Sequence, residues 1–230
     1  MVNYRFSNLL GSTYRGGRVQ FAGEEGNALV SPVGARVSIV DLLQNRTLTL
    51  EPENRHDVAR IALSPDAKLL LSVDTTGHCL LLNFARGTIL SRINFKGKGR
   101  AIKFSPCGRY FAVGVNRNVT IWRTPTLESS WQFVKEVTFG GHMDRINCVS
   151  WSPCSRFLVT GADDSLVRFH TFGKIEGYPL GATLSGQKHA VKGAFFTNDG
   201  KKIISIGADG ACLQYAFEEY DPNNLNLDTA

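Results

Sequence analysis

The chain has 230 residues, 43% of them hydrophobic and 20% charged, which is typical of a globular protein. No apolar stretch reaches the length of a membrane span, and residues 1–8 lack the apolar core of a signal peptide, so we expect no membrane contact. Five cysteines without metal-ligand spacing indicate reduced thiols in the cytosol or nucleus, and a net charge of +6 favours an acidic partner such as RNA.

A phrase recurs five times along the chain, at intervals of 41 to 47 residues. Each copy pairs an alternating strand that ends in an aromatic residue or Leu with a tight polar turn and a second apolar strand. In chain order the copies are anchored at Phe21, Leu63, Phe104, Trp151 and Phe196. A period of this length, built from strands rather than helices, predicts the blades of a β-propeller.

Each repeat continues in the same way. A third apolar strand is expected at 36–41, 78–83, 118–123, 166–170 and 211–215, and a fourth strand follows, for example at 47–50, 89–93 and 182–184. No window shows a sustained helical period. The sequence therefore predicts an all-β propeller of five four-stranded blades at about 1–50, 51–95, 96–138, 139–185 and 186–217, with a polar loop at 218–230 leading to a next blade.

The fourth repeat carries the fullest set of motif residues. His142, preceded by Gly, lies before its first strand, Asp164 lies in the turn before its third strand, and His170 lies in that strand. His189 and Asp209 stand at similar places in the fifth repeat. With the period, these residues resemble the WD-repeat family, in which such a His and Asp pair in a hydrogen-bonded network at the blade corner. The resemblance implies this structural role for His142 with Asp164 and for His189 with Asp209.

The family resemblance also bears on closure, because WD-repeat propellers usually have seven blades. Seven blades need about 300 residues at roughly 40–45 residues each. We therefore expect the five repeats to be part of a seven-bladed ring in a longer protein. A closed five-bladed ring is the alternative, since propellers range from about four to eight blades.

Several segments narrow the resemblance further. They are 4–11, 14–15, 29–37, 94–96, 103–106, 194–196 and 209–210. In this order they resemble the N-terminal propeller region of the periodic tryptophan protein 2 family. That resemblance implies a nucleolar, non-enzymatic scaffold in small ribosomal subunit biogenesis and rRNA processing. Its expected partners are other subunits of a heteromeric subcomplex of the small-subunit processome, together with pre-ribosomal RNA and small nucleolar RNA.

The densest basic run connects the second and third repeats. It contains Arg92, Lys96, Lys98 and Arg100 and no acidic residue. In one interpretation these residues hold RNA phosphates while Phe95 stacks on a base. In the other, the run is a solvated loop that keeps the protein soluble.

The chemistry of known enzyme classes is missing from the sequence. There is no nucleophile elbow, no phosphate-cradling glycine-rich loop and no His-Glu-x-x-His motif, and the five histidines lack metal-ligand spacing. We therefore expect no catalytic residues, no cofactor and no metal site. The alternative function is a peptide-reading WD-repeat adaptor in another nuclear or cytosolic complex, and a propeller enzyme is a third, disfavoured possibility.

Overall fold

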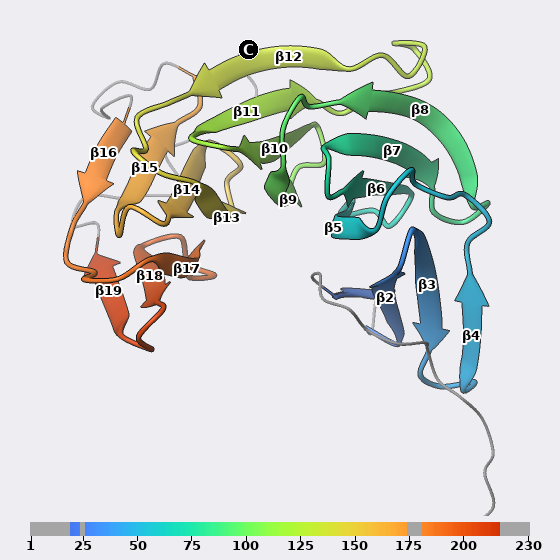
Figure 1. Cartoon of the computed structure of the whole chain (residues 1–230), viewed down its shortest axis with the longest axis horizontal. Helices are drawn as coiled ribbons and strands as arrows, with labels where there is room; N and C mark the ends of the chain where they lie inside the picture. Colours follow the sequence, from blue (N-terminus) through green and yellow to red (C-terminus); the bar gives the residue numbers. More distant parts are fainter. Residues whose placement is uncertain (1–18, 24–25, 174–180, 217–230) are drawn as a thin grey trace, which may run out of the picture. The chain divides into compact units, whose positions relative to one another are not determined.

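The computed structural model describes residues 19–23, 26–173 and 181–216, and every regular element in these ranges is a β-strand. The strands form five antiparallel sheets, four with four strands and one with three (Figure 1). Within each sheet the strands follow one another in chain order, so each sheet is a meander. The prediction of an all-β fold made of repeated antiparallel sheets is confirmed.

The bounds of the strands follow the repeats. The first sheet contains β1 (Gln20–Ala22), β2 (Ala28–Val33), β3 (Arg36–Asp41) and β4 (Arg46–Thr49). The second contains β5 (Val58–Leu63), β6 (Leu69–Asp74), β7 (His78–Asn83) and β8 (Thr88–Asn94). The third contains β9 (Gly99–Phe104), β10 (Tyr110–Val115), β11 (Asn118–Arg123) and β12 (Val134–Phe139). The fourth contains β13 (Ile146–Trp151), β14 (Phe157–Ala162), β15 (Val167–Thr171) and β16 (Gly181–Leu184), and the fifth contains β17 (Val191–Phe196), β18 (Lys202–Gly207) and β19 (Cys212–Ala216).

The predicted repeat boundaries can be compared with these sheets. Phe139, expected to open the fourth repeat, is instead the last residue of β12 in the third sheet, where it pairs with Val119. The fifth sheet has three strands within the described residues. The polar loop expected at 218–230 lies outside the described residues, and the seven-bladed ring stays a prediction.

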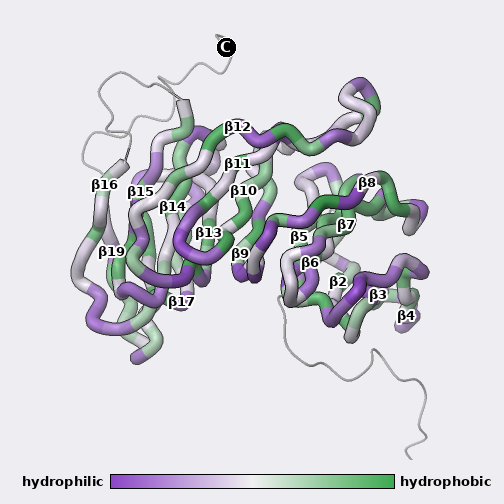
Figure 2. Tube along the Cα trace, turned by 45° about the horizontal axis from the view of Figure 1, so that its top comes forward, coloured by the Kyte–Doolittle hydropathy of each residue, from purple (hydrophilic) through white to green (hydrophobic). Residues whose placement is uncertain are grey.

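The sheets group into two compact units. The N-terminal unit (residues 1–63 and 67–96) holds the first two sheets, and the C-terminal unit (residues 64–66 and 97–230) holds the other three. In each unit, neighbouring sheets bury apolar side chains between them, which is the main source of stability for such stacked sheets. Figure 2 shows hydrophobic residues along the strands and mostly hydrophilic residues at the turns.

The apolar cores lie between successive sheets of a unit. In the N-terminal unit the core includes Val30, Ile61, Leu70 and Leu82. In the C-terminal unit one core lies between the third and fourth sheets and another between the fourth and fifth. The first includes Ala112, Ile121, Trp151 and Leu158, and the second includes Phe157, Val159, Val191 and Ile203.

The repeated polar turn of the sequence has a clear structural reason. In each sheet of the C-terminal unit a hydroxyl at the start of the first hairpin turn accepts a backbone hydrogen bond from across the turn. Ser105 accepts from Tyr110 N–H at 3.1 Å, and Ser152 accepts from Phe157 N–H at 3.0 Å. In the fifth sheet Thr197 takes the same place. The hydroxyl thus satisfies a backbone donor that the turn leaves free, which explains why the residue type recurs.

The first strands of the three C-terminal sheets, β9, β13 and β17, lie next to one another (Figure 1). The indole N–H of Trp151 on β13 donates to the carbonyl oxygen of Lys103 on β9 at 3.1 Å, which fixes the two sheets in register. The segments that lead into these strands therefore meet at one end of the unit.

The fourth and fifth sheets pack closely at Gly161 on β14. A Cβ at this position would lie 2.4 Å from Val191 Cγ1 and 2.8 Å from Cys148 Sγ. We expect Gly161→Ala to lower the free energy of unfolding by about 1–3 kcal/mol, because an added methyl group overfills a packed interface. The change is measured by urea denaturation.

Gly193 on β17 provides the matched control, because a Cβ there would meet its nearest neighbour only at 4.0 Å. We expect Gly193→Ala to change the stability by less than about 0.5 kcal/mol. Equal destabilisation by both substitutions would contradict the close packing at Gly161.

Candidate functional site

The residues of the predicted basic run are divided between the two units. Arg92 lies on β8 and Lys96 follows that strand, both in the N-terminal unit, whereas Lys98 and Arg100 belong to the C-terminal unit. Phe95 is only 8% exposed. The prediction that Phe95 stacks on a base is therefore corrected, because the ring is committed to the interior.

A pocket of about 270 Å³ in the C-terminal unit is lined by Lys98, Arg100, Asn116 and Arg145. We call it the Lys98–Arg145 pocket. Lys98 and Arg145 directly precede β9 and β13, so they occupy equivalent places in two neighbouring sheets. Three cationic side chains and an amide line the pocket, and no carboxylate does.

Backbone contacts hold the walls of this pocket together. Asn116 occupies the left-handed region (φ 52°) in the turn between β10 and β11, where Asn is tolerated. Its carbonyl oxygen accepts a hydrogen bond from Ile146 N–H at 2.8 Å, which ties the segment carrying Arg145 to this turn. Gly97 lies so close that a Cβ there would meet Val115 Cγ1 at 2.7 Å and Asn116 Nδ2 at 3.1 Å. Glycine therefore allows the Lys98 segment to approach the turn.

The guanidinium of Arg100 is oriented by polar neighbours on the next sheet. Its Nη1 donates to Asn147 Oδ1 at 3.4 Å and lies 3.7 Å from Asp163 Oδ2. Asn147 Nδ2 in turn donates to Asp163 Oδ1 at 2.7 Å, and Lys192 Nζ lies 4.0 Å from the same oxygen. One carboxylate is thus shared by two cations, so the cluster retains a positive excess at the pocket.

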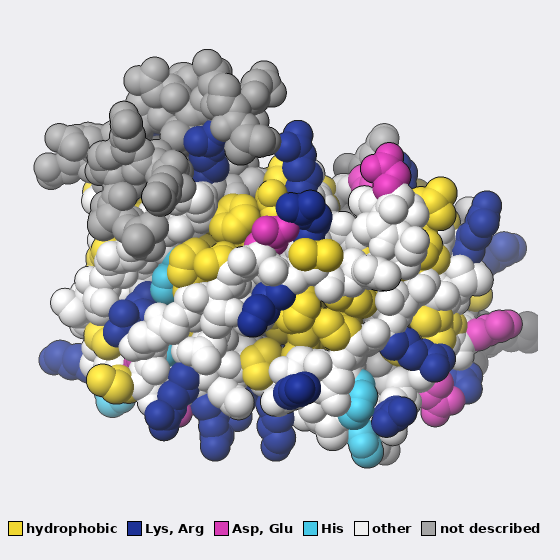
Figure 3. All heavy atoms as spheres, turned by 90° about the horizontal axis from the view of Figure 1, so that it is seen from above, with side chains coloured by type: hydrophobic (Ala, Val, Ile, Leu, Met, Phe, Trp, Pro, Cys, Tyr) yellow, Lys and Arg dark blue, Asp and Glu magenta, His cyan; other side chains and the backbone are white. Residues whose placement is uncertain are grey.

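The side chains of the Lys98–Arg145 pocket determine which ligand it can take. In Figure 3, Lys and Arg side chains of the C-terminal unit project along the lower edge of the view. A pocket lined by cations and an amide, with no aromatic or aliphatic side chain, suits a small anion such as a phosphate group. It offers no aromatic or aliphatic side chain for a base or an apolar group to pack against.

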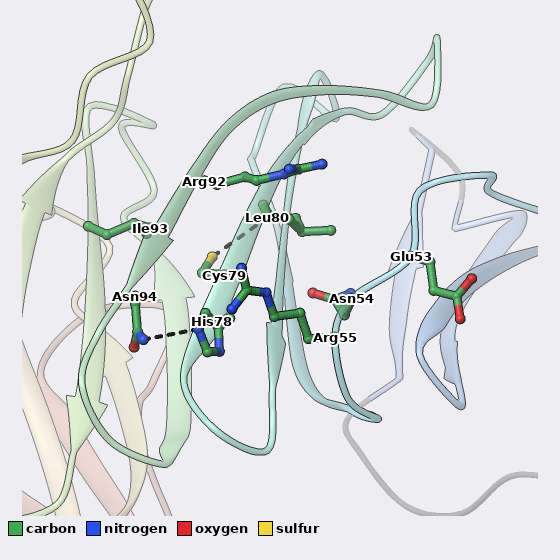
Figure 4. A pocket seen from close by; sticks show the side chains of 9 residues that line it. All are labelled: Glu53, Asn54, Arg55, His78, Cys79, Leu80, Arg92, Ile93 and Asn94. Atoms are coloured by element: carbon green, nitrogen blue, oxygen red, sulfur yellow. Dashed lines mark hydrogen bonds between the residues drawn. The ribbon is translucent and has the colours of Figure 1, made fainter.

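Arg92 lines a different and larger pocket, of about 450 Å³, in the N-terminal unit. We call it the Arg55–Arg92 groove. Its residues come from the segment before β5 and from one end of β7 and β8 (Figure 4): Glu53, Asn54, Arg55, His78, Cys79, Leu80, Arg92, Ile93 and Asn94. Lys96 lines neither pocket.

The predicted blade corner of the fourth sheet is a continuous hydrogen-bonded chain. His142 Nδ1–H donates to Asp164 Oδ2 at 2.9 Å, and His142 Nε2 accepts from Thr160 Oγ1–H at 2.8 Å. Thr160 Oγ1 accepts from His170 Nε2–H at 3.1 Å, and the His170 ring stacks on Phe139 with centroids 4.8 Å apart. The sequence indicated His142, Asp164 and His170, but it gave no sign that Thr160 connects them.

Burial controls the protonation of the two histidines in this hydrogen-bonded network. Burial lowers the pKa of His142, although the carboxylate of Asp164 opposes the shift. Burial, together with nearby His142 and Arg168, lowers the pKa of His170 to about 4. Burial would raise the pKa of Asp164, but hydrogen bonds from His142, Met143 N–H and Leu166 N–H outweigh it and hold that pKa below its usual value. Both imidazoles are therefore neutral near pH 7.

The same contact recurs in other sheets with different residues. In each case the two hydrogen-bonded residues are 18 positions apart in the sequence. The pairs are His142 with Thr160, Asn54 with Ser72 (Nδ2 to Oγ, 2.7 Å) and Gln187 with Ser205 (Nε2 to Oγ, 2.9 Å). The corresponding residues of the third repeat, Phe95 and Val113, are apolar. The corner thus depends on a side chain that can reach the second strand, not on His alone.

In the fifth repeat this recurrence identifies a residue other than His189 at the corresponding position. His189 is exposed, with 61% of its side chain accessible, and its Nε2 lies 4.0 Å from Asp209 Oδ2. Gln187 instead occupies the buried position, and its Nε2 also lies 3.3 Å from the Ala211 carbonyl oxygen. His189 therefore stands two residues away from the position that enters the fold.

Comparison with known proteins places the chain in a class and then in a family. The WD domain, G-beta repeat family matches residues 133–171, which run from β12 of the third sheet through β15 of the fourth. With five repeated antiparallel sheets, the chain is a WD-repeat β-propeller protein.

The chain is 38% identical over 218 residues to Periodic tryptophan protein 2 of Saccharomyces cerevisiae. The matched region covers 94% of the chain and 24% of that protein. The chain is 39% identical over 219 residues to the Schizosaccharomyces pombe homolog, covering 94% of the chain and 25% of the homolog. Against the Mus musculus homolog it is 34% identical over 225 residues, covering 97% and 24%. The chain belongs to the periodic tryptophan protein 2 family and spans about a quarter of the length of these relatives.

Two further kinds of site are absent from the part of the chain that the structure describes. Within residues 19–23, 26–173 and 181–216, no helix is long and apolar enough to cross a membrane. In the same ranges, no group of three or more His, Cys, Asp or Glu residues is placed to hold a metal ion.

The buried His170 generates a prediction about pH. The unfolded chain binds a proton at His170 near pH 6.5, whereas the folded chain binds it only near pH 4. The contribution of His170 to the free energy of unfolding should therefore fall as the pH drops from about 6.5 to about 4, by a total on the order of 3 kcal/mol, and stay constant below pH 4. Urea denaturation at several pH values measures the slope.

The matched comparison uses His170→Gln, which keeps a hydrogen-bonding group near Thr160 but does not titrate. We expect a shallower loss of stability between pH 6.5 and pH 4 in this variant, whatever its stability at pH 7. The exposed His189→Gln variant should keep the slope of the unmodified chain. An unchanged slope in His170→Gln would show that His170 is not the group responsible.

Proposed function

We propose that this protein is a non-enzymatic scaffold in small ribosomal subunit biogenesis, which docks partner proteins and pre-ribosomal RNA within the small-subunit processome. The proposed location is the nucleolus, and the proposed partners are other subunits of a heteromeric subcomplex together with pre-ribosomal and small nucleolar RNA. The observation that carries this proposal is the match to the periodic tryptophan protein 2 family over 94–97% of the chain. The sequence resemblance to that family implies the same setting.

The fold supports a scaffold role on physical grounds. Stacked sheets with buried cores form rigid bodies whose turns and sheet edges are free to contact other molecules. Exposed apolar side chains such as Leu43 and Leu127 lie in turns rather than in the cores. Such a body can hold several partners without a conformational change.

The Lys98–Arg145 pocket is the feature that best supports direct RNA contact. The side chains of Lys98 and Arg145 form no hydrogen bond or ion pair with a carboxylate among the described residues, so their charges are available to a ligand. A small pocket lined mainly by cations suits a backbone phosphate, and phosphate contacts carry no sequence information directly. We therefore propose contact that depends on phosphate and not on RNA sequence. For Arg92 and Lys96, RNA contact remains a prediction.

The peptide-reading alternative fits this pocket poorly. A reader of cationic or methylated tails needs an aromatic cage or a ring of carboxylates. The cations that line the Lys98–Arg145 pocket would repel such a tail. The same cations are compatible with a phosphate.

Crosslinking of the full-length protein to RNA in cells, followed by sequencing of the attached fragments, tests the proposal. We expect fragments from the pre-ribosomal transcribed spacers and from small nucleolar RNA that acts in early processing. Co-purification with nucleolar proteins but without crosslinks would leave a protein-binding scaffold only. If the protein showed no crosslinks to RNA and also did not co-purify with nucleolar proteins, the proposal would be overturned.

The pocket residues give a direct prediction in vitro. Binding of labelled single-stranded RNA by the full chain should weaken as salt rises, and Arg145→Gln should weaken binding to all RNA sequences alike. The slope of the logarithm of the association constant against the logarithm of salt concentration should decrease by roughly 0.7 for each phosphate that the variant no longer neutralises. Fluorescence anisotropy across a series of salt concentrations measures it.

Lys135 on β12 is the matched control, because it is exposed on the same unit and lines neither pocket. Lys135→Gln should leave the slope unchanged. If Arg145→Gln and Lys98→Gln behave like this control while RNA still binds, the RNA contact lies elsewhere.

A further inference from the structure

A carboxylate stands directly beside the Lys98–Arg145 pocket, on Asp163 in the turn between β14 and β15. We propose that Asp163 makes this pocket selective for RNA over DNA, by accepting a hydrogen bond from the ribose 2′-hydroxyl next to a phosphate bound in the pocket. The inference rests on the phosphate role proposed above for the pocket, and it names the residue that decides which nucleic acid the pocket takes.

Two contacts place Asp163 at the edge of the pocket. Its backbone N–H donates to the carbonyl oxygen of Arg145 at 2.9 Å. Its Oδ2 atom lies 3.7 Å from Nη1 of Arg100. Both arginines line the pocket, Arg100 from β9 of the third sheet and Arg145 from the segment that leads into β13 of the fourth. A phosphate on the guanidinium of Arg100 would therefore have the Asp163 carboxylate as a neighbour.

The carboxylate of Asp163 has unused acceptor capacity on the side of Arg100. Its Oδ1 accepts from Asn147 Nδ2 at 2.7 Å, and Lys192 Nζ lies 4.0 Å from the same oxygen. No donor among the described residues lies within hydrogen-bond distance of Oδ2, since Arg100 Nη1 at 3.7 Å gives an ion pair only. The side chain of Asp163 is 26% exposed, so a ligand in the pocket can reach it. A carboxylate accepts hydrogen bonds and donates none, so the ligand group at Oδ2 must be a donor.

The position of this carboxylate is fixed by all three sheets of the unit. Asn147 on β13 holds Oδ1, and its Nδ2 also donates to the carbonyl oxygen of Val191 on β17 at 3.0 Å. Arg100 approaches the carboxylate from the third sheet, and Lys192 approaches it from the fifth. An acceptor that is already held in place loses little conformational entropy when a ligand binds. Asp163 is therefore suited to discriminate between ligands that differ by one donor.

The 2′-hydroxyl is the group that distinguishes RNA from DNA at such a site. It is attached to the ribose carbon next to the one that carries the 3′-phosphate, so in RNA a donor accompanies each backbone phosphate. RNA can thus place a phosphate on the cations and a hydroxyl on Asp163 at the same time. DNA offers the phosphate alone, and the carboxylate then repels that phosphate without receiving a hydrogen bond in return.

A purely supporting role for Asp163 makes a different prediction. If Asp163 only held Arg100 and Asn147 in place, its loss would change the binding of RNA and DNA by the same factor, because both present the same phosphate. The ratio of the two affinities therefore separates selectivity from support.

Binding of labelled uridine dodecamers to the full chain, measured by fluorescence anisotropy, tests the inference. The probes are RNA, the deoxyuridine counterpart and 2′-fluoro RNA, in which fluorine replaces the hydroxyl and cannot donate. We expect the unmodified chain to bind the RNA roughly threefold to tenfold more tightly than either other probe. Asp163→Ala should bring the affinities for all the probes to within about twofold of one another, because no acceptor then distinguishes them.

Asp144→Ala is the matched control, because it removes the same charge from the residue directly before Arg145. The Asp144 carboxylate accepts from Arg145 N–H at 2.8 Å, and Asp144 does not line the pocket. This variant should keep the preference for RNA, and its affinity for all the probes should rise together, since a negative charge near the phosphate is gone. Circular dichroism and urea denaturation establish that both variants are folded.

Equal affinity of the unmodified chain for RNA and DNA would overturn the inference, and so would a preference that survives in Asp163→Ala. A preference that 2′-fluoro RNA shares with RNA would also overturn it, because the hydroxyl donor would then not be the group that is recognised. These results leave the phosphate role of the pocket standing. RNA binding that is unaffected by Arg145→Gln would instead remove the pocket itself and this inference with it, while the cellular crosslinking test of the scaffold role is independent of both.

Discussion

The buried contact that spans 18 residues is the constraint on which the candidate sites depend. In the second, fourth and fifth sheets a side chain located four residues before the first strand donates to, or accepts from, a hydroxyl on the second strand. Such a contact fixes the segment that leads into each sheet, because leaving either partner unpaired in the interior is costly. Arg55 directly follows Asn54, and Arg145 lies three residues after His142. Arginines that line the two pockets are therefore positioned by residues that are themselves buried.

Much of the fold could be predicted, because its signals are periodic. The polar turns at Ser105 and Ser152 and the anchors that recur every 41 to 47 residues reflect hairpins whose hydrogen bonds the structure shows directly. The fifth corner was harder to predict, because Gln187 and His189 are both polar and only His matches the family motif. Side-chain reach and hydrogen-bonding capacity decide the position, and the spacing of 18 residues to Ser205 identifies Gln187. That signal is present in the sequence but appears only when repeats are compared by position.

The candidate pocket illustrates the same limit. The linear basic run indicated Lys98 and Arg100 but not Arg145, which is 47 residues from Lys98, the same interval that separates Phe104 from Trp151. Stacking of sheets brings equivalent positions of successive repeats together. Cationic residues at equivalent positions therefore lie close in space although they are far apart in the sequence. The hydrogen bond between Arg100 and Asn147, which are also 47 residues apart, reflects this geometry. Asn116 gave no sequence signal, because its place in the wall depends on a left-handed turn.

One basic stretch of sequence thus supplies two surfaces with different chemistry. Arg92 lines a groove that also contains a carboxylate and a histidine, whereas Lys98 and Arg100 share their pocket with another cation and an amide. Interactions of exposed charges with phosphates weaken steeply with salt, because counterions compete for both partners. The salt dependence of binding at the Lys98–Arg145 pocket therefore follows from which residues stand beside its arginines.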